Sequence, residues 1–247
     1  TQEVVSKIKD ERLFYFKKEN AERGAARNFG AKKAKGDYIN FFDSDDLAYS
    51  NHLQTACDLI ISEKHPPLFA LHYDIKNTKD QIIRIGTTFK NINEQIIDGN
   101  LLSCNGVFIK KEIALLYPFS ENRELSASED YLLWLQLSAK YNFSYSNIKT
   151  SIIIEHDARS VLTINKDKLI NRKLLMLKMA LEDIYIKEIY KSKLNRLRTN
   201  TYSYLSLHLM MNNYKKEALS YLLKAIQSNL LFIKSKRFLV ILKYYFI

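Results

Sequence analysis

A short apolar run, residues 38–42, is followed directly by three carboxylates, Asp43, Asp45 and Asp46. The run is rich in aromatic and β-branched residues, which predicts a buried strand. In open α/β sheets, ligands bind at the carboxyl ends of strands. On extended backbone Asp43 and Asp45 would point the same way, and carboxylate oxygens there suit a divalent cation. The alternative is a solvated turn whose Asp residues cap the next helix.

Length and composition indicate one large folded domain, or one domain with an appendage. The 247 residues are 47% hydrophobic and 26% charged. The two cysteines, Cys57 and Cys104, give neither a disulfide framework nor metal-ligand spacing, which fits a reducing cytosol and predicts a cytoplasmic location. No apolar run reaches about 18 residues, so no membrane-spanning helix is expected. The chain begins without Met or a signal peptide, and we expect it to be a piece of a longer protein.

The positive charge is concentrated in the last third of the chain. The formal net charge of +11 divides into −1 over residues 1–159 and +12 over residues 160–247. Such a split indicates two parts with different roles. We therefore expect one domain over residues 1–160 and a basic helical extension over residues 161–247.

Short strands alternate with helices in the first part of the chain. A strand at 13–16, a helix at 24–34 and the strand at 38–42 would make a βαβ unit, which predicts parallel pairing. The periodicity predicts further strands at 68–75, 81–85, 104–109, 143–145 and 151–154. It predicts further helices at 51–62, 93–98, 110–116 and 129–140.

Helical periodicity dominates from residue 166 onward, with helices expected at 168–191, 194–211 and 214–228. Residues 230–247 mix aromatic and aliphatic side chains with lysines and predict an amphipathic helix. This mixture suits an anionic membrane surface, with a plain solvated face as the alternative. No nucleic-acid-binding motif is visible, so nucleic acid is not an expected partner.

Several segments together resemble the family 2 glycosyltransferases with the GT-A fold. Residues 26–30 read A-R-N-F-G, residues 34–39 read A-K-G-D-Y-I, and residues 43–45 read D-S-D, in that family's order and spacing. An E-D pair at 129–130, expected to open a helix, matches a later motif. The resemblance covers about residues 10–160. It implies an α/β GT-A fold, a mixed sheet flanked by helices, followed here by an α-helical C-terminal extension.

One departure concerns the start of the family pattern. The family's first two strands, which bind the base and ribose of the nucleotide, have no counterpart in this sequence. Residue 1 falls roughly where the helix after the second strand would lie. We therefore expect the chain to be either a fragment that lacks these strands or a degenerate copy.

The resemblance implies an inverting, metal-dependent transferase that moves a sugar from a nucleotide-diphosphate donor, such as a UDP-sugar, to a polysaccharide or a lipid-linked glycan. The expected location is cytoplasmic, with peripheral association at the inner face of the membrane. The alternative is a catalytically inactive, truncated module that binds a glycan, a partner or a membrane. A calcium loop of the EF-hand type is excluded, because that pattern needs a ligand at 47 and Gly at 48, where the chain has Leu47 and Ala48.

The resemblance also assigns roles to the acidic residues. Asp45 would bind the metal directly, with Asp43 near the ribose or a metal-bound water. The cation, Mn²⁺ or Mg²⁺, would act as a Lewis acid on the departing diphosphate. Asp130 would be the general base for the acceptor hydroxyl. The alternative is that Glu129 and Asp130 only favour the helix N-terminus through its dipole.

Three basic residues complete the predicted site. His156 would contact the metal or the diphosphate, and Arg159 would approach a phosphate, since Arg suits bidentate contacts. For each, the alternative is an ordinary surface side chain. Arg27 would orient the nucleotide or, alternatively, form a structural ion pair with one of the aspartates.

Overall fold

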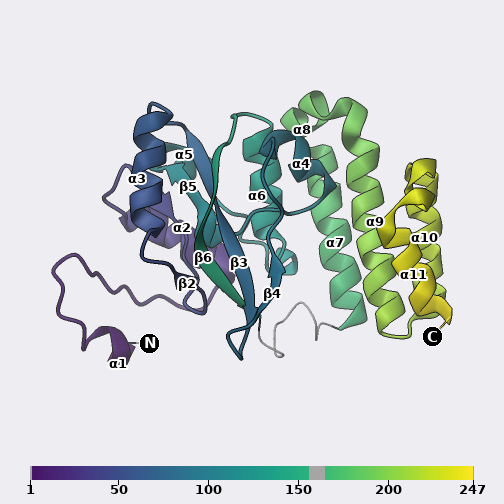
Figure 1. Cartoon of the computed structure of the whole chain (residues 1–247), viewed down its shortest axis with the longest axis horizontal. Coiled ribbons are helices and arrows are strands. Elements are labelled where there is room, and N and C mark those ends of the chain that lie inside the picture. Colours follow the sequence, from purple (N-terminus) through teal and green to yellow (C-terminus); the bar gives the residue numbers. More distant parts are fainter. Residues whose placement is uncertain (1, 156–164, 247) are drawn as a thin grey trace.

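A mixed six-stranded sheet with a helical region beside it makes up the computed structural model, which describes residues 2–155 and 165–246 (Figure 1). The strands are β1 (Tyr38–Asn40), β2 (Leu47–Ala48), β3 (Leu68–Asn77), β4 (Ile82–Ile85), β5 (Val107–Lys110) and β6 (Ser144–Glu155). Their order is β1-β5-β3-β6-β2, with β4 also paired to β3. Only the β3–β6 pairing is parallel among the described strands. The predicted fold class is confirmed.

The helices fall into two groups. Those in the sheet domain are α1 (Gln2–Val5), α2 (Glu22–Lys33), α3 (His52–Ser62), α4 (Ile92–Gln95), α5 (Lys111–Leu116) and α6 (Glu129–Ser138). Those after it are α7 (Lys166–Glu182), α8 (Ile184–Ile189), α9 (Leu194–Met211), α10 (Lys215–Ser228) and α11 (Lys236–Phe246). Short 3₁₀ turns are η1 (Ile96–Asp98), η2 (Cys104–Gly106), η3 (Arg123–Leu125), η4 (Lys191–Lys193) and η5 (Leu230–Lys234). No helix in the described ranges is long and apolar enough to cross a bilayer.

The two faces of the sheet are buried by different helices, and β3 shows why. Side chains alternate along a strand, so Leu68 and Ala70 enter the main core while Phe69 and Leu71 enter a second cluster beneath α3. All four side chains are at most 1% exposed. A strand buried on both faces reads as a continuous apolar run, as residues 68–71 do.

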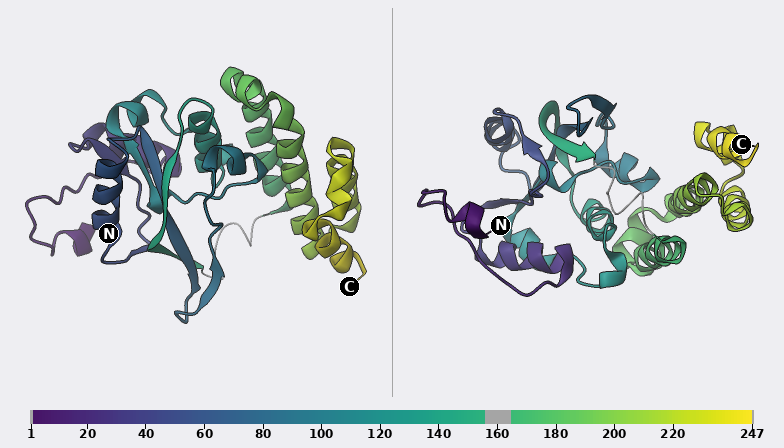
Figure 2. Two further views of the ribbon diagram at one scale, coloured as in Figure 1. Left: turned by 45° about the horizontal axis from the view of Figure 1, so that its top comes forward. Right: turned by 90° about the horizontal axis from the view of Figure 1, so that it is seen from below.

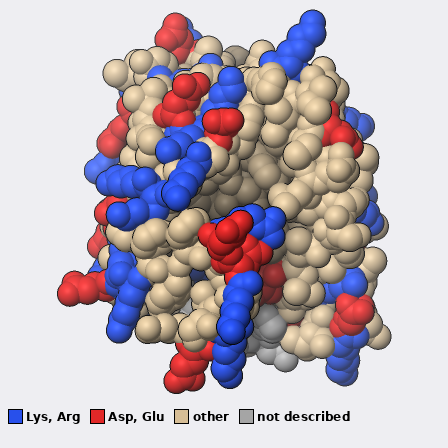
Figure 3. Space-filling view, turned by 90° about the vertical axis from the view of Figure 1, so that its left-hand side faces the viewer, with Lys and Arg blue, Asp and Glu red and all other residues tan. Residues whose placement is uncertain are grey.

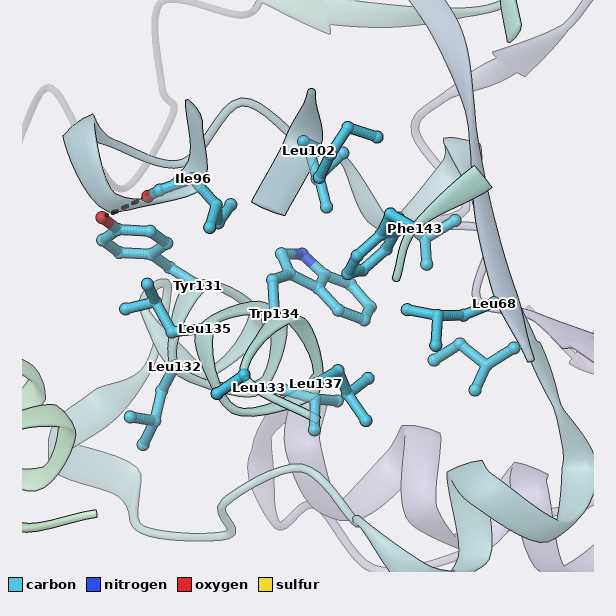
Figure 4. Packing of buried hydrophobic residues seen from close by; sticks show 14 of the residues in the cluster. Leu68, Ile96, Leu102, Tyr131, Leu132, Leu133, Trp134, Leu135, Leu137 and Phe143 are labelled. Atoms are coloured by element: carbon cyan, nitrogen blue, oxygen red, sulfur yellow. Dashed lines mark hydrogen bonds between the residues drawn. The ribbon is translucent and has the colours of Figure 1, made fainter. Parts of the chain in front are cut away.

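Helix α6 is the centre of the main core (Figure 4). Its apolar residues lie around most of its circumference, a pattern typical of a buried helix. Trp134 is fully buried and lies close to Leu102 and Phe143, as the sequence predicted for a core residue. The Tyr131 hydroxyl donates a hydrogen bond of 2.9 Å to the carbonyl of Ile96. These contacts fix the start of α6, where the Glu129–Asp130 pair lies.

The helical region is attached to the sheet domain through α7. Met176, Leu177 and Ala180 of α7 belong to the same hydrophobic cluster as α6. A second cluster then joins α7, α9, α10, η5 and α11, which lie side by side away from the sheet (Figure 2). Because α7 contributes to both clusters, it holds α9 at a fixed position beside the sheet domain.

Two predictions near the N-terminus are wrong. Residues 13–16 form no strand, because no described strand pairs with them, and their side chains are 41–54% exposed. There is therefore no βαβ unit before residue 42. Instead, β1 lies at one edge of the sheet and pairs antiparallel with β5, with Ile39 opposite Ile109.

Other elements differ from prediction at identifiable residues. The helix expected at 168–191 divides at Asp183, whose carboxylate accepts hydrogen bonds from the backbone of the next turn and caps α8. The helix expected at 230–247 divides at Ser235 into η5 and α11. The two strands expected between 143 and 154 form one strand, β6, with a register shift opposite His72. The helix expected at 194–211 is confirmed as α9.

Candidate active site

A cavity of about 350 Å³ lies at the carboxyl ends of β1 and β6, beside the start of α6. Ligands of open α/β sheets bind at this kind of edge. Acidic side chains reach its wall from three segments: Asp43, Asp45 and Asp46 after β1, Glu129 and Asp130 on α6, and Glu155 at the end of β6. Arg23, Arg27 and Arg84 also line it. The cavity therefore combines carboxylates with guanidinium groups.

The three aspartates after β1 lie on a turn. The backbone N–H of Asp46 donates to the carbonyl of Asp43 at 3.1 Å, which closes a β-turn. The expectation of an extended backbone from 43 to 45 is therefore wrong. Asp46 accepts a hydrogen bond of 3.1 Å from Asn105, whereas exposed Asp45 makes no side-chain hydrogen bond or ion pair with another described residue. Its carboxylate is thus available to a ligand.

Arg27 of α2 joins the two acidic segments. Its Nη2 donates to both carboxylate oxygens of Asp43 at 2.9 and 3.0 Å, and its Nη1 donates to Glu129 at 3.0 Å. The side chain is 9% exposed, and the guanidinium lies 5.2 Å from the ring centre of Phe119. Burial alone would lower the pKa of Arg27, but neighbouring anionic groups, including Asp43, outweigh it and raise the pKa. The ion pair that the sequence left as one alternative is present.

The Glu129–Asp130 pair occupies the first turn of α6. Glu129 is buried, and its pKa is raised by burial and by the adjacent Asp130 carboxylate. Asp130 is partly exposed to the cavity and accepts hydrogen bonds from Asn100 Nδ2 at 3.0 Å and from the backbone of Tyr131 at 2.7 Å. Asp130 therefore lies both in the first turn of α6, where the helix dipole favours its charge, and in the wall of the cavity.

Four of the predicted site residues meet in this cavity, namely Arg27, Asp43, Asp45 and Asp130. Two others, His156 and Arg159, lie outside the described residues. The roles assigned to these side chains toward a nucleotide or a metal stay predictions.

Sequence reasoning missed several residues of the wall. Asn100 belongs to no motif, and only the fold brings it to Asp130. Arg84 lies on the short strand β4 and likewise carries no local signal. Glu155 did carry a local sequence signal, because it follows the apolar run 152–154 as Asp43 follows residues 38–42. A carboxylate directly after a buried strand is a pattern that could have found it.

Comparison with known proteins indicates the family that this chain resembles. Residues 1–108 match the model of the family described as glycosyl transferase family 2. The chain is 29% identical over 168 residues to an uncharacterized glycosyltransferase of Haemophilus influenzae, covering 66% of this chain and 62% of the relative. It is 28% identical over 144 residues to the Escherichia coli UDP-Glc:alpha-D-GlcNAc-diphosphoundecaprenol beta-1,3-glucosyltransferase WfgD, covering 58% of this chain and 55% of that protein. The chain thus spans less than two thirds of these relatives.

The fold resembles that of TarS 1–349 from S. aureus. That crystal structure aligns with a TM-score of 0.58 at 17% identity, over 90% of this chain and 64% of TarS. A second TarS structure, in complex with UDP-GlcNAc, aligns with a TM-score of 0.52 at 14% identity, over 84% of this chain and 70% of that one. The fold is that of a GT-A glycosyltransferase domain. Residues 1–108 thus match glycosyl transferase family 2, the family that the sequence resembles.

Proposed function

We propose that this chain is the part of an inverting, metal-dependent glycosyltransferase that moves a sugar from a UDP-sugar to a lipid-linked or polysaccharide acceptor. The observation that carries the proposal is the cavity in which Asp45 and Asp130 arrive from two separate motifs, with Arg27 holding those motifs together. TarS, which has this fold, has been crystallised with UDP-GlcNAc, and WfgD uses a UDP-sugar. Both findings support a uridine nucleotide donor.

Asp130 suits the role of general base. Its two hydrogen bonds, from Asn100 and the Tyr131 backbone, hold the carboxylate at the cavity wall. There it would take the proton from an acceptor hydroxyl. The acceptor oxygen forms a bond to the anomeric carbon as the bond between that carbon and the diphosphate oxygen breaks. This single displacement inverts the configuration and releases the nucleoside diphosphate.

A divalent cation fits the donors that follow β1. Asp45 presents a carboxylate that has no partner among the described residues, and Mg²⁺ and Mn²⁺ prefer such oxygen ligands together with phosphate oxygens. Bound there, the cation would neutralise negative charge on the leaving diphosphate. Asp43 is less suited to direct ligation, because Arg27 already occupies both its oxygens. We assign Asp43 to orienting the donor side of the cavity.

The outer edge of β1 is relevant to how the site would bind a nucleotide. β1 is an edge strand, and a groove of about 460 Å³ lies between it and α2, lined by Arg27, Ile39 and Asp43 among others. Exposed strand edges pair readily with a further strand. We propose that additional strands pair here in the complete donor site. A transferase-like module without them, binding only a glycan, a partner or a membrane, is the alternative function.

The C-terminal region supports contact with a membrane surface. Exposed apolar side chains on η5 and α11 include Leu230, Leu231, Leu239 and Phe246, each 61–81% exposed. Lysines are interspersed among them. We propose that this face rests on anionic lipid at the cytoplasmic side, where a lipid-linked acceptor would be presented. The opposite end of the molecule, seen in Figure 3, carries Lys and Arg interspersed with Asp and Glu.

The test is a transfer assay on the full-length gene product with UDP-sugars and Mn²⁺. Asp45→Asn and Asp130→Asn should each abolish transfer, and only the first should weaken metal-dependent donor binding. The matched control is Asp58→Asn on α3, an exposed aspartate whose carboxylate accepts a hydrogen bond from Gln54. Wild-type turnover in Asp45→Asn or Asp130→Asn would contradict the corresponding role.

A further inference from the structure

Basic side chains gather where α7 and α9 pack together beside the 126–128 loop. Arg172 and Lys173 lie on α7, His208 on α9 and Arg237 on α11; we call these four residues the cationic seam. The three basic neighbours of His208 all lie close enough to act on its charge. Within residues 2–155 and 165–246, no carboxylate forms an ion pair with any member of the seam.

Arg172 shows most clearly that the seam has more hydrogen-bond donors than acceptors. Its side chain is buried at 4% exposure, and its Nη1 donates to the carbonyl of Ser126 at 3.1 Å. The Nε and Nη2 groups are buried and have no hydrogen-bond partner among residues 2–155 and 165–246. Buried guanidinium donors normally meet acceptors, because a buried charged donor without a partner keeps its full desolvation penalty. Two such donors on one side chain indicate a missing acceptor.

Burial and neighbouring charges also disfavour the charged forms of Lys173 and His208. The pKa of Lys173 is lowered to about 8 by burial and by Arg172. The pKa of His208 is lowered to about 4, by burial first and then by Lys173 and Arg237. Nearby Asp130 and Glu129 offset only part of this effect on Lys173. An anion beside Arg172 and Lys173 would favour the charged forms of both side chains.

The seam adjoins the acceptor side of the cavity. Lys173 donates 3.2 Å to Ser128 Oγ, and Ser128 directly precedes the Glu129–Asp130 pair. Ala127 of the same loop lines the cavity and holds a left-handed backbone, with φ of 67°. The 126–128 loop thus separates the seam from the proposed general base. The predicted metal ligand, Asp45, belongs to the different segment that follows β1.

We infer that the cationic seam binds a phosphate group carried by the acceptor. Arg172 would supply two N–H donors, and Lys173 and Arg237 would supply charge, the combination that suits phosphate oxygens. This inference rests on the proposed function for its acceptor, and it specifies the acceptor class: a sugar linked through phosphate or diphosphate. It places that phosphate beside α6, apart from the donor diphosphate.

The binding test uses inorganic pyrophosphate, titrated calorimetrically in EDTA at constant ionic strength. Wild-type protein should bind it saturably. Lys173→Met should lose affinity by about tenfold or more, since a charge-assisted contact is removed. The matched control is Lys168→Met, an exposed lysine on the same helix, which should bind as the wild type does. Arg237→Gln provides a second variant of the seam should Lys173→Met not fold.

Asp45→Asn separates the seam from the donor site. It should leave pyrophosphate binding in EDTA unchanged. Absence of binding by the wild type, or unchanged affinity in Lys173→Met, would overturn the inference. Because this titration needs no turnover, it can succeed or fail independently of the transferase assay.

A second arm distinguishes an acceptor phosphate from free phosphate. Transfer is measured to an N-acetylglucosamine diphosphate alkyl ester and to the matching alkyl glycoside. Lys173→Met should raise KM about tenfold for the diphosphate ester and leave KM for the glycoside unchanged. An equal effect on both acceptors would show that the seam does not hold the acceptor phosphate.

Discussion

Arg27 holds Asp43 through two hydrogen bonds, at 2.9 and 3.0 Å, from a guanidinium whose side chain is 9% exposed. The same guanidinium reaches Glu129, 102 residues further along the chain, at 3.0 Å. One side chain on α2 thereby fixes the turn after β1 against the start of α6. The distance between the predicted metal ligand and the predicted base depends on this clamp.

Loss of the clamp should be strongly destabilising. Arg27→Met leaves Glu129, whose side chain is 4% exposed, as an unpaired buried carboxylate. Breaking a buried pair in this way costs about 3–5 kcal/mol. Chemical denaturation should show this loss. Arg23→Met, which removes an exposed arginine from the same helix and cavity wall, should change stability by less than about 0.5 kcal/mol.

Two glycines of α2 should respond in opposite ways to alanine. A Cβ on Gly24 would lie 2.4 Å from the carbonyl oxygen of Ser120, so Gly24→Ala must displace backbone and should cost about 1–3 kcal/mol. A Cβ on Gly30 would meet nothing within 4 Å, so Gly30→Ala should stabilise the helix by about 0.5–1 kcal/mol. Thermal melts of the two variants test the close packing of α2 on the 119–120 segment. Equal effects would contradict it.

The depressed pKa of His208 predicts a loss of stability in acid. Its folded pKa is about 4, below the ordinary value of 6.5, so between these pH values the unfolded chain binds more protons. Stability should therefore fall as the pH drops from 6.5 toward 4. His208→Gln should flatten this part of the profile, while His65→Gln, at an exposed position, should not. Parallel slopes for the wild type and His208→Gln would contradict the prediction.

The exposed face of η5 and α11 should bind anionic vesicles. Cosedimentation with vesicles containing phosphatidylglycerol should fall with rising salt, because the lysines act through screened charge. Leu239→Glu, at a position 61% exposed, should weaken binding without unfolding the protein. Leu53→Glu on α3, 69% exposed and far along the chain, is the matched control. Equal binding to neutral vesicles would contradict the electrostatic part of the proposal.

Much of the fold could be predicted from the sequence, because local patterns determined it. The apolar run at 68–71 and the periodicity of 194–211 gave β3 and α9 directly. The strand predicted at residues 13–16 was wrong, because an aromatic run forms a strand only where another strand can pair with it. Asp183 was missed as a cap because the helical periodicity continues across it.

The site was partly predictable for a related reason. Asp45 and Asp130 lie in contiguous motifs, which a sequence displays. Asn100 reaches Asp130 across 30 residues, and Arg172 is buried against a distant loop, so only the packed fold brings these partners together. The order of residues along a chain does not encode such contacts in any local pattern.

Calorimetric titration of the full-length gene product with UDP, with and without Mn²⁺, tests the proposed donor site. We predict saturable binding that needs the metal and is lost in Asp45→Asn but kept in Asp58→Asn. Metal-dependent binding of equal affinity in Asp45→Asn would contradict it. So would UDP binding that is unaffected by removal of the metal.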